Sequence, residues 1–193
     1  MKIIQTGFLI AIVLFSTTIF AQSEIEAFVQ EGIQYHDSGD YEKAIETYQK
    51  ALKLDPKSTL VNYEIALSYF TKGDHKEAIK YSDVVLKQNE DYLIPAYITK
   101  GSSLDMLGKT KESIKLFKKA IKKTDGHYLL HYNLGLNYFK TNDLDAAEEN
   151  VLKESPLKES AKEIVPKKRW ADWSATDEEE LIFDMNKFET IQS

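Results

Sequence analysis

A pair of histidines is the part of this 193-residue sequence whose spacing comes nearest to a chemical site. His127 and His131 are four residues apart, so on a helix they share one face, as two metal ligands would. The sequence places no third ligand beside them. His131 also stands where equivalent segments of the chain have Phe28 and Tyr97. We therefore interpret His131 as a packing residue, and we predict no metal and no other cofactor.

The other polar residues form no catalytic set in the sequence. His36 and His75 fall at a predicted helix end and a predicted turn, and no serine, histidine and aspartate recur with assignable roles. Carboxylates are interleaved with lysines on helix faces, as Glu42 and Glu46 are with Lys50. The sequence has no cysteine that could act as a nucleophile or a thiolate ligand. We predict that the protein is not an enzyme.

The stretch over residues 31–56, EGIQYHDSGDYEKAIETYQKALKLDP, predicts two helices joined by a tight turn. Small and aromatic residues recur at helical spacing and predict two facing stripes. These stripes consist of Phe28, Gly32 and Tyr35 on the first helix, and of Ala44, Tyr48 and Ala51 on the second. Gly39 is placed to take the left-handed conformation that ends the first helix, and Asp40 is placed to cap the second.

The same pattern returns at a near-constant spacing and predicts four units. The position of closest helix contact holds Gly32, Ala66, Gly101 and Gly135. The turn position, which needs a residue that accepts a left-handed backbone, holds Gly39, Gly73, Gly108 and Asn142. Small residues also recur on the second helix, as Ala44, Ala78, Ser113 and Ala147.

These residues resemble the tetratricopeptide repeat family over about residues 25–154, and the first unit matches the family's 34-residue pattern almost residue for residue. The resemblance implies an all-α fold, a right-handed α-α superhelix or solenoid of about four helical hairpins with a C-terminal extension. The chain departs from the family pattern in three places. Ser82 replaces an aromatic residue, an extra residue lies near Tyr92, and the family proline is absent after the second and third units.

We expect the repeat array to span residues 22–155, followed by an extension over residues 156–193. Its units are predicted at about 25–58, 59–93, 94–127 and 128–155. Helices are predicted at 23–38, 41–54, 58–71, 75–88, 94–107, 110–123, 128–140, from 144 onward, and at 177–189. Two roles stay open for the last helix: it covers the end of the solenoid, or it lies in the groove and competes with a partner.

The first 21 residues differ in composition from the rest of the chain. Lys2 is followed by an apolar run and then by a small residue, Ala21, which predicts a signal peptide cleaved after Ala21. The ending FAQ resembles signal peptides of Gram-negative bacteria, those of Bacteroidetes in particular. The expected location is periplasmic or secreted, with no membrane insertion once the signal is removed. An uncleaved N-terminal helix that anchors the protein in a membrane is the alternative.

In tetratricopeptide arrays the first helices of successive units line a concave groove. Carried over to this chain, the resemblance assigns partner-binding roles to Val29, Ile33, Tyr63, Leu67, Phe70, Ile98, Tyr132, Leu136 and Phe139. Equivalent groove positions hold His36, Ser102 and Asp105. Family members that clamp the carboxylate of chaperone C-termini have lysine, asparagine and arginine where this chain has Val29, Ile33 and Tyr63, so we do not expect that activity.

We expect a non-enzymatic scaffold that binds a protein or peptide segment in this apolar, aromatic groove. The formal net charge of -6 and the mixing of acidic residues with lysines argue against nucleic acid as a partner. Two alternatives stay open. The protein could be a structural component or adaptor of an envelope or secretion assembly, or it could be a fragment of a longer tetratricopeptide-repeat sensor protein.

Overall fold

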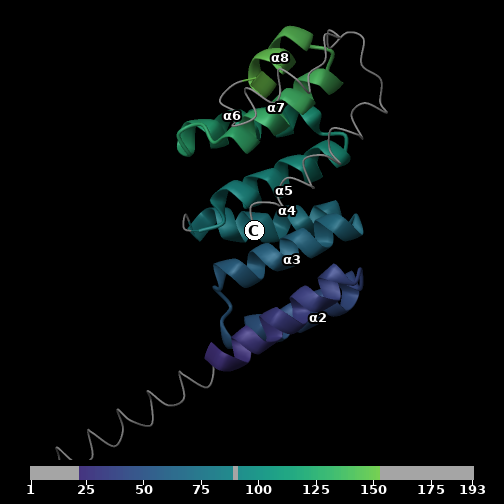
Figure 1. Cartoon of the computed structure of the whole chain (residues 1–193), viewed down its shortest axis with the longest axis vertical. Helices are drawn as coiled ribbons and strands as arrows, with labels where there is room; N and C mark the ends of the chain where they lie inside the picture. The colour runs from purple at the N-terminus through teal and green to yellow at the C-terminus, as the bar shows by residue number, and fades with distance from the viewer. Residues whose placement is uncertain (1–21, 89–90, 153–193) are drawn as a thin grey trace, which may run out of the picture. The chain divides into compact units, whose positions relative to one another are not determined.

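The computed structural model describes residues 22–88 and 91–152, and every regular element within them is a helix (Figure 1). The first helix covers residues 22–37. It is followed by α2 (Tyr41–Leu54), α3 (Thr59–Lys72), α4 (His75–Gln88), α5 (Leu93–Met106), α6 (Thr110–Lys123), α7 (Tyr128–Lys140) and α8 (Leu144–Leu152). These helix limits lie within one residue of the predicted ones, and the all-α prediction is confirmed.

The chain also divides into two compact units that are larger than the single repeats, and these are called the first and second unit from here on. The first ends at Leu116, and the second begins at Phe117. The first unit holds the helices from residue 22 to α5, and the second holds α7 and α8. The predicted signal peptide and the C-terminal extension with its helix at 177–189 lie outside the described residues. Within the described residues, no helix is both long and apolar enough to cross a membrane.

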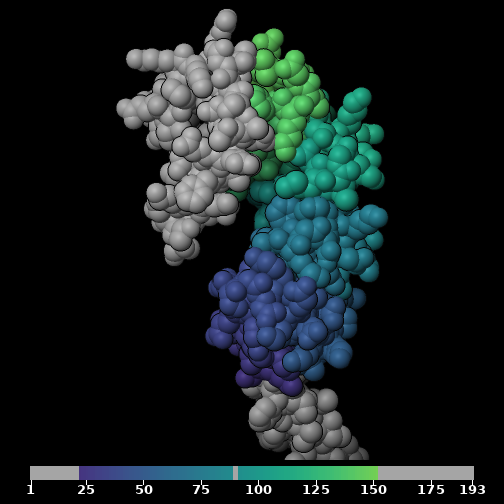
Figure 2. Space-filling view, turned by 90° about the vertical axis from the view of Figure 1, so that its right-hand side faces the viewer, coloured from purple at the N-terminus to yellow at the C-terminus, as the bar shows by residue number. Residues whose placement is uncertain are grey.

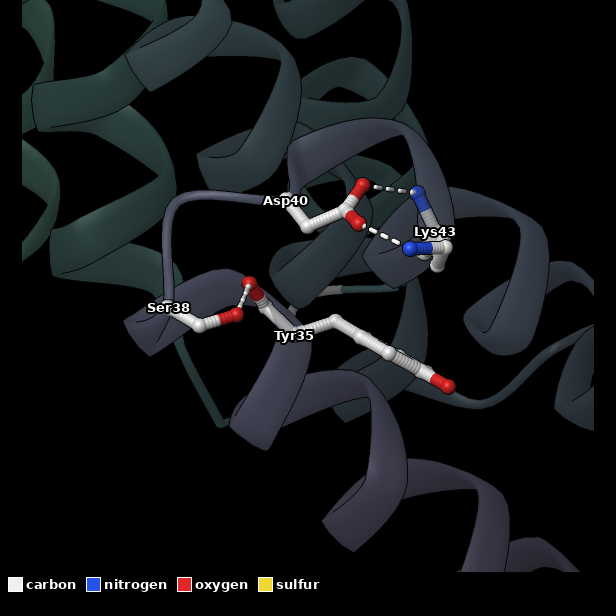
Figure 3. Close-up of polar contacts among 4 residues, drawn as sticks. All are labelled: Tyr35, Ser38, Asp40 and Lys43. Atoms are coloured by element: carbon white, nitrogen blue, oxygen red, sulfur yellow. Dashed lines mark hydrogen bonds and ion pairs between the residues drawn. The ribbon is translucent and has the colours of Figure 1, made fainter.

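The turn into α2 shows how local sequence sets the helix limits (Figure 3). Gly39 has a φ of +81°, in the left-handed region where a side chain is strained. Asp40 caps α2, because its carboxylate accepts a hydrogen bond from the backbone N–H of Lys43 at 3.3 Å and lies 2.5 Å from the Lys43 Nζ. The Ser38 hydroxyl donates to the Tyr35 carbonyl at 2.9 Å. These bonds satisfy backbone groups at both helix ends.

The later turns repeat this backbone conformation at the positions that the sequence predicts. Gly73, Gly108 and Asn142 have φ values of +92°, +74° and +61°. In the first of these turns, the Asp74 N–H donates to the carbonyl of Tyr69, and the bond closes the end of α3. The predicted left-handed turns are confirmed at all these positions.

The seam of the first hairpin depends on a glycine that faces a tyrosine ring. The Tyr48 side chain is fully buried, and a Cβ added to Gly32 would overlap its ring. Ala44 and Ala51, also fully buried, flank the ring on α2. In the space-filling view, the first hairpin forms a continuous purple to blue surface on the face shown (Figure 2). Glycine therefore permits the close helix contact that the tyrosine fills.

The second hairpin, formed by α3 and α4, fills its equivalent seam with different residues. Ala66 takes the glycine position, and Ser82, which takes the tyrosine position, is fully buried. The aromatic contact moves by one residue, because the Tyr81 ring stacks on the Tyr69 ring with centroids 5.6 Å apart. The departure of Ser82 from the family pattern thus changes which aromatic residue packs, while the hairpin itself is kept.

In the second unit, α7 and α8 pack against each other as a hairpin. Gly135 marks their closest contact, since a Cβ there would lie 2.6 Å from Val151 Cγ2. The seam is therefore built as in the first hairpin, with valine in place of tyrosine. On the same helix, the Tyr138 ring lies under the Lys118 Nζ, 5.2 Å from the ring centroid.

Candidate functional site

The candidate groove of the first unit is formed by the helix at 22–37, α3 and α5. The imidazole of His36 on the first of these helices lies 2.8 Å from the Ser68 hydroxyl on α3, measured from Nδ1 to Oγ. Further along, α3 contacts α5 directly. Consecutive first helices are therefore neighbours in this unit, as the prediction of a shared groove requires.

Most of the predicted groove residues keep part of their side chain accessible. Val29 is the exception: it is 5% exposed and belongs to the core of the first hairpin, so it offers almost no surface to a ligand. The half-buried residues are Ile33, Tyr63, Leu67, Phe70 and Ile98 in the first unit, and Tyr132, Leu136 and Phe139 in the second. Half-buried side chains are held by their neighbours and still have area to bury against a partner.

An aromatic stack at the start of α3 adds a residue that the sequence reasoning missed. The rings of Tyr63 and Tyr92 are stacked with centroids 5.2 Å apart. Tyr92 is 37% exposed and has a φ of +66°, which is unusual for a bulky residue. The sequence signal that could have pointed to this stack was the extra residue near Tyr92.

The loop that carries Tyr92 follows a helix end tied to the start of α3. The Gln88 side chain, at the end of α4, donates from Nε2 to the Lys57 carbonyl at 2.9 Å. The Thr59 hydroxyl donates to the Gln88 Oε1. Because a single glutamine bonds to both residues, the end of α4 is held beside the segment that leads into Tyr63.

A partly buried carboxylate lies beside the aromatic residues of α3. The Tyr48 hydroxyl donates to Glu64 Oε2 at a long 3.5 Å. Burial raises the pKa of Glu64 above its ordinary value, and the nearby negative charge of Asp37 raises it further. Burial also raises the pKa of the Tyr48 phenol, so its proton stays on the oxygen. The carboxylates of Glu64 and Asp37 are therefore close enough for their charges to interact.

The His36 and Ser68 pair has the residue types of a nucleophile and its base, but its surroundings do not suit catalysis. Ser68 is 0% exposed, so no substrate can reach its hydroxyl. Burial lowers the pKa of His36, and this outweighs the opposite effect of Asp37, so the imidazole is neutral at pH 7. We interpret the pair as a bridge between neighbouring first helices.

The predicted histidine pair of the second unit is used for structure. His127 caps α7, where its Nδ1 accepts a hydrogen bond from the Leu129 N–H at 3.3 Å. His131 is buried, and its Nδ1 lies 3.1 Å from Asn150 Oδ1 on α8. Nowhere in residues 22–88 and 91–152 do three histidine, aspartate or glutamate side chains converge as metal ligands. The packing interpretation of His131 agrees with its burial.

Three family models match the chain. One, described as TPR repeat, matches residues 32–73, and two described as tetratricopeptide repeat match residues 61–92 and 98–158. Among curated proteins, the photosystem I assembly protein Ycf3 of Prochlorococcus marinus is 31% identical over 113 residues, which cover 52% of this chain and 64% of that protein. A probable N-acetylglucosaminyltransferase of Hordeum vulgare, SPINDLY, is 26% identical over 132 residues, 65% of this chain and 14% of that protein. The chain thus spans less than two thirds of each relative.

Solved structures show the same fold. The crystal structure of MamA is matched with a TM-score of 0.61 at 24% identity, over 78% of this chain and 86% of that one. The first TPR of Spaghetti (RPAP3) bound to an HSP90 peptide gives a TM-score of 0.55 at 20% identity, over 62% and 94%. YrrB, described as a TPR protein with an unusual peptide-binding site, gives 0.56 at 20% identity, over 76% and 77%. The predicted solenoid class is confirmed by these structures.

Proposed function

This chain is a tetratricopeptide-repeat protein, and we propose that it is a non-enzymatic scaffold that binds a protein or peptide segment along its first helices. The observation that carries the proposal is the half-buried stripe of Tyr63, Leu67 and Phe70 on α3, with Tyr92 stacked at its end. The seam of the first hairpin is closed by other residues, and within the stripe the Phe70 ring also packs on His75 of α4, with ring centroids 5.6 Å apart. Structurally similar RPAP3 and YrrB are described with a bound peptide and a peptide-binding site.

The chemistry of the stripe favours docking by side-chain burial. Aromatic and aliphatic residues supply most of the binding energy at peptide-binding surfaces, where each well-placed anchor contributes about 2 kcal/mol or more. Positions where carboxylate-clamp members have polar residues hold the half-buried Ile33 and Tyr63 here, and the buried Val29 at a third. A partner should therefore be anchored through large apolar side chains along its length and not by a terminal carboxylate.

A non-enzymatic function also agrees with the polar groups of the described residues. The Ser68 hydroxyl is inaccessible, and His127 and His131 are engaged in a helix cap and in a contact with α8. The transferase name of the Hordeum vulgare relative belongs to a protein of which this chain matches 14%. We propose that the two proteins share the repeat array and that the chemistry belongs to the rest of the relative.

We propose that the scaffold works outside the cytoplasm, in the periplasm or beyond it. The support is the sequence of residues 1–21, whose apolar run ends at Ala21 immediately before the first helix described by the structure. The ending of this segment resembles bacterial signal peptides, so we propose a Gram-negative bacterial source. The alternative remains an uncleaved segment that holds the scaffold at a membrane.

A second candidate function is a structural or adaptor role in an envelope or secretion assembly. The lysines of α6 favour it, because all of them are exposed and give this helix a strongly basic outer surface: Lys111, Lys115, Lys118, Lys119, Lys122 and Lys123. In that case the contacts would be made by second helices, and a change in the groove would leave the assembly intact.

The test is capture of binding proteins from an envelope extract, with mass spectrometry of what is retained. The baits are the chain from residue 22, the same chain with Tyr63→Ala, and a surface control with Glu46→Gln. The scaffold proposal expects a protein that the first and third baits retain and that Tyr63→Ala loses. Retention by all three baits, with loss only when the lysines of α6 are replaced by glutamine, would favour the structural role.

A further inference from the structure

Charge is divided unequally between the first helices and the second helices of the first unit, each set taken together. The three first helices contain six carboxylates, on Glu24, Glu26, Glu31, Asp37, Glu64 and Asp105. They contain two lysines, Lys72 and Lys100. The second helices α2 and α4 reverse the balance, with six lysines against four carboxylates. Most of this acidity lies on the helix at 22–37, which carries four of the six carboxylates and no lysine, whereas α3 and α5 each carry one carboxylate and one lysine.

Both lysines of the first helices are engaged with carboxylates. The Lys72 Nζ lies 3.1 Å from Glu42 Oε1 and 2.9 Å from Asp74 Oδ2. The Lys100 Nζ lies 2.6 Å from Asp83 Oδ1 on α4. These pairs bring acidic groups of second helices and turns onto the only cations of the first helices, so they do not compensate the carboxylates nearer the groove.

Two of those carboxylates neighbour predicted groove residues on their own helices. Asp37 is exposed and follows Ile33 by one helical turn, on the face that also carries His36. Glu64 adjoins Tyr63 in the chain, and the charge of Asp37 acts on it directly. His36 is neutral at pH 7 because burial lowers its pKa, so it does not offset either charge. The groove at this point is apolar and negative.

We infer that the groove of the first unit selects a partner segment in which lysine or arginine stands next to large apolar side chains. This inference rests on the proposed function and names the chemistry of its partner. The apolar side chains bury against Leu67 and Phe70, while the cations lie near Asp37 and Glu64. The stacked rings of Tyr63 and Tyr92 favour the same partner, because a cation is also attracted to the face of an exposed aromatic ring.

The test uses two fluorescein-labelled probes, an amphipathic peptide of leucine and lysine and a peptide of equal length with glutamate in place of every lysine. Anisotropy at physiological salt, where charges are screened beyond about 8 Å, limits the contribution of long-range attraction. The groove variant carries Asp37→Asn with Glu64→Gln. The matched control carries Glu46→Gln with Glu77→Gln on second helices and has the same net charge. Melting curves confirm that each variant is folded.

The lysine probe should bind wild type and the control with equal affinity, and it should bind the groove variant about tenfold or more weakly. The glutamate probe should bind none of them. Equal losses in both variants, tighter binding of the glutamate probe, or no binding of the lysine probe would overturn the inference. If an envelope protein is still retained in a Tyr63-dependent manner in any of those cases, the scaffold proposal stands and only the partner's chemistry is wrong.

Discussion

At the scale of single residues, two buried serines at equivalent positions have opposite surroundings. Ser68 on α3 and Ser103 on α5 are both 0% exposed. The Ser68 hydroxyl has the His36 imidazole as its partner, whereas the Ser103 hydroxyl has none among the described residues. The repeat register explains the difference, because Phe70 occupies in α3 the position that His36 occupies in the preceding first helix. A phenyl ring cannot supply the missing hydrogen bond.

We predict opposite effects when these two serines are replaced by alanine. Ser103→Ala removes an unsatisfied buried hydroxyl and should stabilise the protein by about 1 kcal/mol. Ser68→Ala leaves His36 without its partner and should destabilise it by about the same amount. Urea unfolding monitored by circular dichroism measures both. Destabilisation by Ser103→Ala equal to that of Ser68→Ala would show that the two sites are not different in this way.

Glu64 gives the second prediction at this scale. Its folded pKa is raised above the ordinary 4.5, so folding favours its protonated form. The associated stability is therefore fully present below pH 4.5 and is lost as the pH rises through the folded pKa. Glu64→Gln should accordingly be more stable than wild type at pH 7, and the difference should vanish in acid. A constant difference across the pH range would contradict the assignment.

At the scale of helices, seam glycines fix how closely the first hairpin and the hairpin of α7 and α8 close. We predict that Gly32→Leu destabilises the protein by about 1 to 3 kcal/mol, because the new side chain must displace the buried Tyr48 ring. The control is Gln34→Leu, an exposed position of the same helix that should change stability little. Thermal melting compares them. Partial rescue of Gly32→Leu by Tyr48→Ala would identify the ring as the obstacle, and similar melting of the two single variants would exclude it.

Helix limits and turns could be predicted from the sequence because they depend on local residues. Gly39 and Asp40 carry the signals for a left-handed turn and a helix cap, and the structure uses both. Side-chain depth and the contacts between neighbouring hairpins were harder to predict from the sequence. The predicted groove residue Val29 is in the core, and the stack of Tyr92 on Tyr63 was missed. Periodicity gives the face of a helix, whereas the depth of a side chain depends on neighbours distant in sequence.

At the scale of the whole molecule, the chain combines a repeat array with terminal segments of different composition. We predict export with cleavage between Ala21 and Gln22, since the apolar run ends at a small residue directly before the repeats. N-terminal sequencing of the protein from cell fractions measures this. A form that begins with Gln22 in the periplasm or medium is expected, and a form that begins at Met1 in the soluble cytoplasm would contradict the prediction.

The central claim is that the stripe on the first helices binds a partner and is not merely part of the core. Tyr63 and Tyr132 occupy equivalent groove positions on α3 and α7, while Tyr69 on α3 packs on Tyr81 of α4. The most direct measurement compares the double variant Tyr63→Ala with Tyr132→Ala against the single variant Tyr69→Ala. For each protein, the melting temperature is recorded beside the affinity for the captured partner.

We expect the groove variant to melt close to wild type and to bind at least about thirtyfold more weakly, since each lost anchor is worth about 2 kcal/mol. Tyr69→Ala should melt at a clearly lower temperature and keep its affinity per folded molecule. The contrary result is a groove variant that melts as early as Tyr69→Ala and binds as tightly as wild type once corrected for the folded fraction. The two tyrosines would then be core residues, and the partner would bind elsewhere.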